Sequence, residues 1–492
     1  MPHQNGAQDD AIVNGTPLVD LTEDMRECAR QVYGAPLPDD LMVWGKFDSD
    51  LPTGSIKARP AAYIIHDAIR SGTLRSGQII IEATSGNFGI ALGGMSDIGL
   101  KVVSLVSRKL QEGVFEELRS ENVHTIDLDM DICPAPGMKE SAGALAAKAT
   151  AANIRMQLAK LGLDPAVFDK AYPQIEQLLA AQDIINLAKL LGNIYGMFCP
   201  EQYDNELNIE SHRTITAPEM DQQLHERGHS LGEYTVLCTF GTGGTSGGIG
   251  RYIYDKYGKR SVHVVFPPAG QDVAGIRTKD KADGLGLYRP QEYAGEHEVD
   301  FERARRLLRF FAKRGRDIGE SSALALYAAM RMASRDGGGR FVVMIADGIN
   351  KYRKSLEAAA SPNPQVSLED AASATDDYDR IIWVHAQYTP REAGIDLIAR
   401  SLGVDKSKIS IPKASTVGRM LMTQEVPEEI KRDLQGKKGK SLLVCMAGNT
   451  SLMASKVLAK NGITAQSLNG GITNLPESMG RHPGEFIRPA TQ

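Results

Sequence analysis

The chain has 492 residues, 42% of them hydrophobic and 24% charged, a balance typical of globular protein and a length too great for one hydrophobic core. The net charge of -5 argues against a nucleic acid or an anionic membrane as partner. The five cysteines are scattered and never paired as CxxC, the start is polar and no apolar run could span a membrane. We therefore expect a cytoplasmic protein without a disulfide framework, a zinc site or a membrane segment.

Short apolar runs alternate with helical patterns from Leu41 onward, after a start (1–15) that predicts a flexible tail. The runs are rich in β-branched residues and lack polar alternation, as in strands buried on both faces of a parallel sheet. They are QIIIEA (78–83), KVVSLVS (101–107), YTVLCTF (234–240), SVHVVFP (261–267) and RFVVMIAD (340–347). Because each precedes a helical candidate, the pattern predicts an α/β fold with crossover units.

The stretch from 134 to 196 is rich in Ala and Leu at helical spacing, which predicts a helical insertion. It could be packing scaffold, an interface or a cap over an active site. Exposed helices of this composition would suit a homodimer.

A second module is predicted near the C-terminus. Residues 356–377 combine Ala, Ser, Pro and acids without sustained periodicity, which predicts a linker. Strand candidates then alternate with helices over 378–492, so we expect a catalytic domain over 16–355 and a smaller α/β domain after the linker.

A glycine-rich loop follows the strand candidate 234–240 and leads into a helix. Its N–H groups can converge on one point at a helix start, which favours a bound phosphate. The loop has no lysine for a P-loop, and Ser246 replaces the third glycine of a dinucleotide fingerprint. The residues assigned to the phosphate are Gly241, Thr242, Gly243, Gly244 and Thr245.

Two further segments complete a constellation suited to pyridoxal phosphate (PLP). Lys57 follows a small-residue turn and offers an amine for a Schiff base. The turn after the strand candidate 78–83 offers hydroxyls and N–H groups to a substrate carboxylate, and Asn87 can donate to the phenolic oxygen of the cofactor. The residues assigned to the substrate are Thr84, Ser85, Gly86 and Phe88.

From about Asp48 to Tyr352 the chain resembles the cysteine synthase and cystathionine β-synthase family of fold type II PLP enzymes. PTGSIKAR, EATSGNFGIAL, FCPEQYDNELN, GTGGTSGGIGRY, GESSA and ADGINKY carry the resemblance. It implies a catalytic fold of two subdomains like the tryptophan synthase β-subunit, with Lys57 as the Schiff-base residue. It also implies Ser321, with Ser322 as the close alternative, facing the pyridine nitrogen.

A neutral hydroxyl at that nitrogen favours loss of a β leaving group over racemisation or transamination. The resemblance therefore implies β-replacement or β-elimination on a serine- or cysteine-type amino acid through an aminoacrylate intermediate, with Lys57 as general base. Phe88 departs from the family, which usually has threonine or glutamine after the asparagine, and predicts a less polar substrate pocket. This departure leaves the nucleophile open.

In the second module, Cys445 ends a strand candidate and opens a tight loop before a helix, where backbone N–H groups would stabilise a thiolate or persulfide. The segment 441–472 resembles a rhodanese-like domain, which implies a sulfane sulfur on Cys445. Thr450 stands where active rhodaneses usually have arginine, so the domain could instead serve substrate binding or assembly. We interpret His385, near a strand end, as packed or solvated and not catalytic.

The main hypothesis is a PLP enzyme of sulfur amino-acid metabolism that takes an amino acid and a sulfur donor or acceptor. Three alternatives stay open: cysteine breakdown with sulfur passed to Cys445, β-replacement with an amine giving a diamino acid, and a ligand-binding regulator without turnover.

Overall fold

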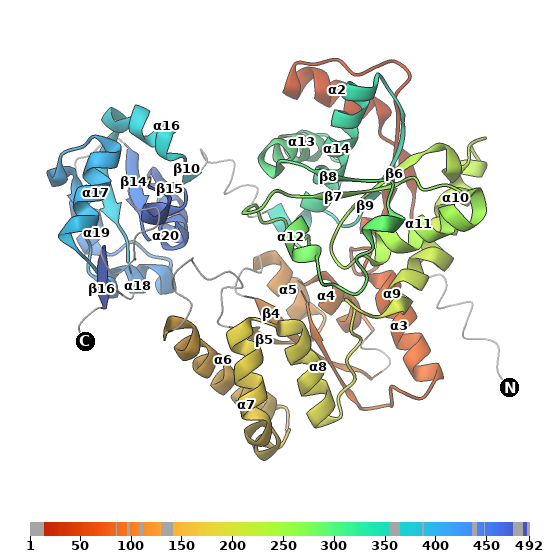
Figure 1. The fold of residues 1–492 in the computed structure, drawn as a ribbon, viewed down its shortest axis with the longest axis horizontal. Coiled ribbons are helices and arrows are strands. Elements are labelled where there is room, and N and C mark those ends of the chain that lie inside the picture. Colours follow the sequence, from red (N-terminus) through yellow and green to blue (C-terminus); the bar gives the residue numbers. More distant parts are fainter. Residues whose placement is uncertain are drawn as a thin grey trace. The chain divides into compact units, whose positions relative to one another are not determined.

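The computed structural model describes residues 14–84, 86–95, 99–107, 112–128, 141–353, 365–385, 388–434, 440–446, 448–475 and 486–489. Most of the predicted tail, residues 1–13, lies outside these ranges. The chain divides into two compact units, whose described residues run from 14 to 353 and from 365 to 489 (Figure 1).

The first unit contains a six-stranded sheet in the order β1-β2-β9-β6-β7-β8, in which β1 is antiparallel to β2 and the other neighbours are parallel. Phe47 on β2 lies opposite Ile345 on β9, so both strands end at the same edge of the sheet. Lys57 follows β2, and the glycine loop follows β6 in the same sheet. The strands are β1 (Leu18–Asp20), β2 (Met42–Phe47), β6 (Thr235–Thr239), β7 (Val262–Phe266), β8 (Gly295–Glu298) and β9 (Arg340–Ile345).

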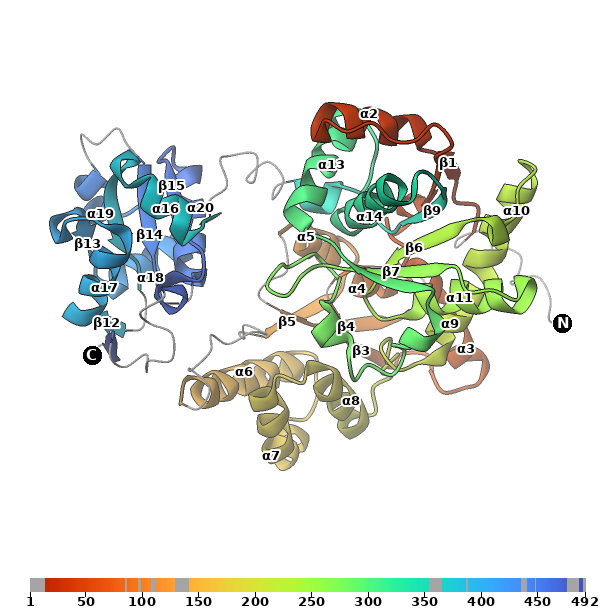
Figure 2. The same ribbon diagram turned by 45° about the horizontal axis from the view of Figure 1, so that its top comes forward.

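Helices cover both faces of this sheet (Figure 2). Val236 and Val342 pack in one cluster with residues of α10 (Ala217–His225) and α11 (Gly244–Tyr257). The helix α14 (Glu320–Asp336), most of whose residues are buried, contacts β6, β7 and β9. Strands enclosed in this way lose their polar alternation, which is why they could be recognised from sequence. The remaining helices of this subdomain are α2 (Thr22–Tyr33), α3 (Ala58–Arg70), α9 (Glu206–Ser211), the π-helix His212–Thr216, α12 (Lys279–Ala282) and α13 (Phe301–Lys313).

A three-stranded parallel sheet, β3-β4-β5, forms the second subdomain of this unit. The predicted insertion supplies helices whose apolar side chains, including Ile154, Phe168 and Leu187, pack with Val103 and Ile126 of the sheet. Most apolar residues of these helices pack inward against the small sheet. The homodimer predicted from these helices stays a prediction. The elements are β3 (Ile79–Ala83), β4 (Lys101–Ser107), β5 (His124–Leu128), α4 (Asn87–Gly93), α5 (Glu112–Ser120), α6 (Ser141–Lys160), α7 (Pro165–Ala181) and α8 (Ile184–Tyr195).

The second unit is built on a five-stranded parallel sheet in the order β10-β15-β14-β11-β13. Along β11, Ile381 and Trp383 pack with residues of α16 and α17, whereas Ile382 and Val384 share a cluster with residues of α18, α19 and α20. The unit therefore has three layers. Its elements are β10 (Gln365–Val366), α16 (Leu368–Ser373), β11 (Tyr378–Trp383), β12 (Tyr388–Pro390), α17 (Glu392–Leu402), β13 (Ile409–Ser410), α18 (Ala414–Thr423), α19 (Glu428–Leu434), β14 (Lys440–Val444), α20 (Asn449–Lys460), β15 (Ala465–Leu468) and β16 (Ile487–Pro489).

The predicted linker over 356–377 is wrong for its second half. Residues from Gln365 onward form β10 and α16, and Ala371 is fully buried in the core of the second unit. Val366 and Leu368 pack against the same core. A few apolar side chains in a segment rich in Ala, Ser and acids therefore suffice to build an edge strand and a short helix. Residues 354–364 lie outside the described ranges.

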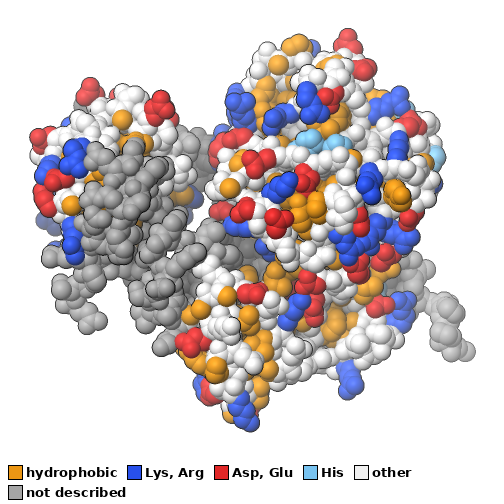
Figure 3. Space-filling view, viewed as in Figure 1, with side chains coloured by type: hydrophobic (Ala, Val, Ile, Leu, Met, Phe, Trp, Pro, Cys, Tyr) orange, Lys and Arg blue, Asp and Glu red, His pale blue; other side chains and the backbone are white. Residues whose placement is uncertain are grey.

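Within the described ranges, none of the helices combines the length and hydropathy needed to cross a bilayer. Basic and acidic side chains are intermingled on the face shown in Figure 3, consistent with the small net charge.

We expect the insertion helices to contribute to the stability of the first unit. Phe168 is fully buried among the helices and the small sheet, so Phe168→Ala should lower the free energy of unfolding by about 3–5 kcal/mol. Chemical denaturation followed by circular dichroism would measure the change. Phe310→Ala on α13, where the side chain is partly exposed, is the matched control and should cost clearly less. Equal unfolding midpoints for the two variants would contradict this role.

Candidate active site

The turn before α3 presents Lys57 at the edge where β2 and β9 end. Ile56 N donates to Ala346 O (2.7 Å), and Ser55 pairs with Asp347 in a β-bridge. The Lys57 amine makes no hydrogen bond or ion pair with any described residue, and burial alone lowers its pKa to about 8. Such an amine is partly neutral near physiological pH and can act as a nucleophile or base.

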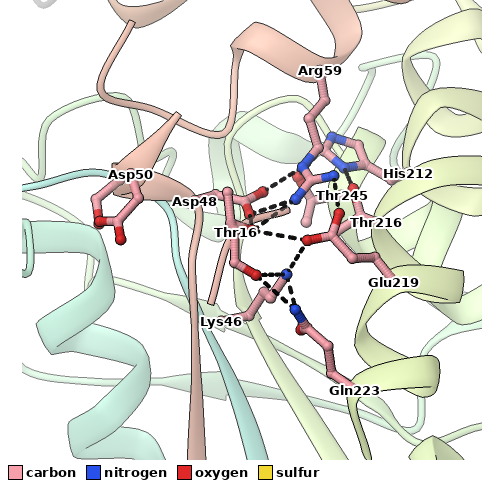
Figure 4. Close-up of polar contacts among 11 residues, drawn as sticks. Thr16, Lys46, Asp48, Asp50, Arg59, His212, Thr216, Glu219, Gln223 and Thr245 are labelled. Carbon is pink, nitrogen blue, oxygen red and sulfur yellow. Dashed lines mark hydrogen bonds and ion pairs between the residues drawn. The ribbon is translucent and has the colours of Figure 1, made fainter. Parts of the chain in front are cut away.

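A buried ion cluster anchors the helix that begins after Lys57 (Figure 4). Arg59, fully buried, donates through Nε and Nη2 to both oxygens of Asp48 (2.8 Å each) and through Nη1 to Glu219 (2.9 Å). Lys46, also fully buried, donates to Glu219 Oε1 (2.5 Å) and to Thr16 O (2.5 Å). Two cations thus share two carboxylates, which fixes the first turn of α3 to β2 and α10.

The glycine loop begins where β6 ends and runs into α11. Gly243 has φ +97°, and a Cβ there would lie 2.5 Å from Leu287 O. A Cβ on Gly244 would lie 2.0 Å from Asn208 Oδ1, and one on Gly241 would lie 2.9 Å from Gly275 O. The loop therefore requires glycine at these positions, and its backbone N–H groups can approach an anion closely.

Thr242 keeps one hydrogen free for such an anion. Its Oγ1 accepts from Asn208 Nδ2 (3.0 Å) and from Gly244 N (3.3 Å). Because both lone pairs of the hydroxyl are engaged, its O–H remains available to donate. Asn208 also donates to Gln202 O (2.8 Å) and thereby ties the loop to the segment before α9.

His212 contacts the glycine loop and is affected by the charge of Lys57. Its Nε2 lies 3.2 Å from Thr245 Oγ1 and its Nδ1 lies 2.8 Å from Thr216 Oγ1. Burial, and then the positive charges of Lys57 and Arg59, hold the pKa of His212 well below its usual value. The imidazole ring is therefore neutral. The charge of Lys57 acts on this histidine, which contacts Thr245 of the glycine loop.

The predicted substrate loop is largely described. Thr84 Oγ1 accepts from Gly86 N (3.1 Å), and Gly86 adopts φ +121°, which a residue with a Cβ rarely takes. Ser85 lies outside the described residues. Phe88 is only 1% exposed, so its ring is buried. The roles of these four residues toward a substrate remain predictions.

Asn87, the first residue of α4, reaches across to the end of β9. Its Nδ2 donates to Asp347 Oδ2 (2.8 Å), and its Oδ1 accepts from Lys351 Nζ (2.9 Å). Tyr352 also donates to Asp347 Oδ2. Burial raises the pKa of the Asp347 carboxyl.

The start of α14 distinguishes Ser321 from Ser322. Ser322 Oγ accepts from Ala346 N (3.1 Å), so that hydroxyl is engaged with the end of β9. The Ser321 hydroxyl has no partner among the described residues, although the residue is 5% exposed. Gly319 N donates to Asp347 O (2.8 Å), which brings this helix start to the same junction as Ser55 and Asn87.

Sequence reasoning missed four residues that organise this site: Asn208, His212, Asp347 and Lys351. The motifs that contain Asn208, Asp347 and Lys351 were recognised as family-like, but polar residues inside them received no role. Their partners lie far away in the sequence, so only the folded contacts reveal what they do.

The second unit holds Cys445 directly after β14. Its buried Sγ accepts from Gly448 N (3.1 Å), from Ser451 N (3.4 Å) and from Ser451 Oγ (3.3 Å). The sulfur therefore lies against the start of α20. His385 is buried at the end of β11, in agreement with a packed histidine. The described residues contain no cluster of three or more His, Cys, Asp or Glu arranged to hold a metal.

The residues of the first unit fit PLP. PLP carries an aldehyde and a phosphate. The desolvated Lys57 amine, which has no partner among the described residues, matches the aldehyde. The glycine loop, which leaves no room for a Cβ, and the Thr242 hydroxyl with its free hydrogen match the phosphate.

Comparison with known proteins agrees with this fit. The family model described as pyridoxal-phosphate dependent enzyme matches residues 13–348. A cysteine synthase of Staphylococcus aureus (strain Mu50) is 28% identical over 343 residues, which cover 68% of this chain and 91% of that protein. The O-acetylserine dependent cystathionine β-synthase of Bacillus subtilis (strain 168) is 27% identical over 329 residues, which cover 64% and 89%.

Among solved structures, a mutant of O-ureido-L-serine synthase with O-ureido-L-serine bound shares the fold, with a TM-score of 0.53 and 21% identity. The match covers 76% of this chain and 99% of that one. Since the family model spans most of the chain, this protein belongs to the pyridoxal-phosphate dependent enzymes, is similar to cysteine synthases and, like its family, uses PLP.

Proposed function

We propose that the first unit catalyses β-replacement or β-elimination on an amino acid of the serine or cysteine type. The observation that carries this proposal is the Lys57 amine, which is desolvated and unpaired among the described residues. Its charge acts on His212, which contacts Thr245 of the glycine loop. The similarity to cysteine synthases supports a substrate with a leaving group on its β-carbon.

Bound PLP supplies an electron-withdrawing ring that acidifies the α-hydrogen of an amino acid. Lys57, with a pKa near 8, is suited to take that hydrogen as a proton and to return it. The glycine loop and Thr242 hold the phosphate, Asn87 donates to the 3-oxygen, and the 84–88 loop receives the substrate carboxylate. Ser321 offers the ring nitrogen a neutral hydroxyl, which disfavours reactions that need a protonated ring.

The nucleophile is proposed to be a sulfur compound. Two alternatives use the same residues: cysteine breakdown with release of sulfur, and replacement by an amine giving a diamino acid. The fold is shared with O-ureido-L-serine synthase, whose named product contains no sulfur. This similarity is the reason for retaining a non-sulfur nucleophile as an alternative.

We further propose that the second unit is rhodanese-like and handles sulfur at Cys445. The Cys445 thiolate would attack the outer sulfur of a sulfane donor, form an S–S bond and release the rest of the donor with the bonding electron pair. A thiol would then accept this sulfur. The position of Sγ against the start of α20 supports this role, whereas Met446 and Thr450 bring no positive charge to the loop.

The first test is the absorption spectrum of the purified protein before and after addition of O-acetyl-L-serine. We expect a visible cofactor band that shifts on addition, because the amino acid displaces Lys57 from the cofactor. Lys57→Ala should lose the starting band, and Lys406→Ala, an exposed lysine of the second unit, should keep it. A cofactor band indifferent to O-acetyl-L-serine, cysteine and phosphoserine would refute the proposed substrate class.

The pH dependence of cofactor attachment tests the state of Lys57. Only the neutral amine reacts with an aldehyde, so attachment of PLP to the apoprotein should be half-maximal near pH 8 and not near the ordinary lysine pKa of about 10.5. Borohydride trapping followed by mass spectrometry would count Lys57 adducts at each pH. A midpoint above pH 10 would contradict a desolvated amine.

Sulfur transfer by the second unit is tested with Cys445→Ser in the full chain. Incubation with thiosulfate or cysteine persulfide, followed by cyanide, should yield thiocyanate from the wild type and none from the variant. Cys199→Ser, in the first unit, is the matched control and should transfer sulfur normally. If the wild type also fails with both donors, the sulfur-carrying role is refuted.

A further inference from the structure

Lys351 lies in the short helix Asn350–Tyr352 after β9, and its side chain is only 4% exposed. Its Nζ lies 2.9 Å from Asn87 Oδ1 and 3.1 Å from Glu117 Oε2. It also lies 3.4 Å and 3.5 Å from the carbonyl oxygens of Thr53 and Gly54. One buried cation therefore joins the turn that precedes Lys57, the first residue of α4 and the helix α5.

This contact determines the orientation of the Asn87 amide. An ammonium group has only donors, so the amide must turn its oxygen toward Lys351 and its nitrogen toward Asp347. The Asp347 carboxylate oxygen takes one hydrogen of Nδ2 at 2.8 Å. Asn87 also interacts with the Tyr352 hydroxyl, so both hydrogens of Nδ2 lie on the side of the amide that faces away from Lys351. If the amide were reversed, its oxygen would face Asp347, and its nitrogen would face an ammonium that cannot accept.

We propose that Lys351 is a positioning residue that holds the Asn87 amide with its N–H toward the 3-oxygen of PLP. The inference rests on the proposed function, because it needs the cofactor to lie against Asn87. Lys351 does not touch the reacting atoms and acts through Asn87. A donor at the 3-oxygen stabilises its deprotonated form, whereas a carbonyl oxygen there would repel it.

The same lysine connects the two subdomains of the first unit. Glu117 belongs to α5, which packs on the three-stranded sheet, whereas Lys351 follows the six-stranded sheet. A Cβ on Gly113 of α5 would lie 2.6 Å from Lys351 O, so the backbones approach closely. A cavity of about 250 Å³ beside this contact is lined by Lys351, Glu117 and Gly54, among others. The Asn87 amide is therefore held in place from both subdomains.

The test compares Lys351→Met with Lys351→Arg in the PLP-loaded protein. The methionine variant keeps most of the side-chain length but cannot donate, so the amide can rotate. We expect its near-ultraviolet cofactor band to grow at the expense of the visible band across the pH range, and PLP to bind about tenfold more weakly. Arginine still donates and should restore most of the visible band.

Two controls make the result decisive. Lys406→Met, an exposed lysine paired with Glu392, controls for the substitution itself and should leave the cofactor bands unchanged. Thermal unfolding of each variant separates a folding defect from a local effect. If Lys351→Met folds and its cofactor bands match the wild type, the inference is overturned.

Asn87→Ala separates failure of this inference from failure of the proposed site. A shift of the bands in Asn87→Ala but not in Lys351→Met would leave Asn87 on the cofactor and remove Lys351 from its control. Unchanged bands in Asn87→Ala would instead refute the role of Asn87, and the inference about Lys351 with it. Loss of the cofactor band in Lys57→Ala tests the proposed function independently of both.

Discussion

The position of Lys57 depends on a buried ion cluster whose charges balance without solvent. Arg59 and Lys46 are both fully buried, and together they face the carboxylates of Asp48 and Glu219. Removing one partner from such a set leaves an unpaired buried charge, which costs about 3–5 kcal/mol. Because Arg59 lies two residues after Lys57, the cluster fixes the start of α3, and with it the direction of the chain that presents the amine.

A second constraint is the junction after β9. Ala346 and Asp347 receive hydrogen bonds from the Lys57 turn, from the start of α14 and from Asn87, three segments that are far apart in the sequence. The Lys57 turn follows β2, which ends at the same edge of the six-stranded sheet as β9, whereas Asn87 follows β3 of the three-stranded sheet. The junction therefore joins the two subdomains. Lys57, the start of α14 and Asn87 are consequently held relative to one shared segment, Ala346 and Asp347.

Much of this arrangement could be predicted from the sequence, for physical reasons. Strands enclosed by helices are continuously apolar, and all five runs that we singled out between 78 and 347 coincide with strands of the first unit. The loop over 241–244 could be recognised from its glycines, which are required because a Cβ at these positions would collide with neighbouring atoms. Lys57 and Asn87 could be proposed because chemistry demands an amine and an amide near such a loop.

The residues that we did not predict act through contacts with residues far away in the sequence. Asp347 and Lys351 matter because they meet Asn87, some 260 residues away. Asn208 matters because it fills the space that Gly244 leaves empty. The end of the linker was misjudged because Val366 and Ala371 gain their core only when the strands beside them are in place. Local composition cannot report such long-range burial.

The environment of Cys445 narrows the sulfur chemistry proposed for the second unit. An arginine in the loop would attract an anionic donor such as thiosulfate and stabilise the departing anion. Here the sulfur is instead surrounded by neutral donors, two backbone N–H groups and the Ser451 hydroxyl. Such neutral donors add little long-range attraction for anions. The sulfur transfer proposed for Cys445 therefore favours a persulfide donor, whose outer sulfur is already at the sulfane level, over thiosulfate.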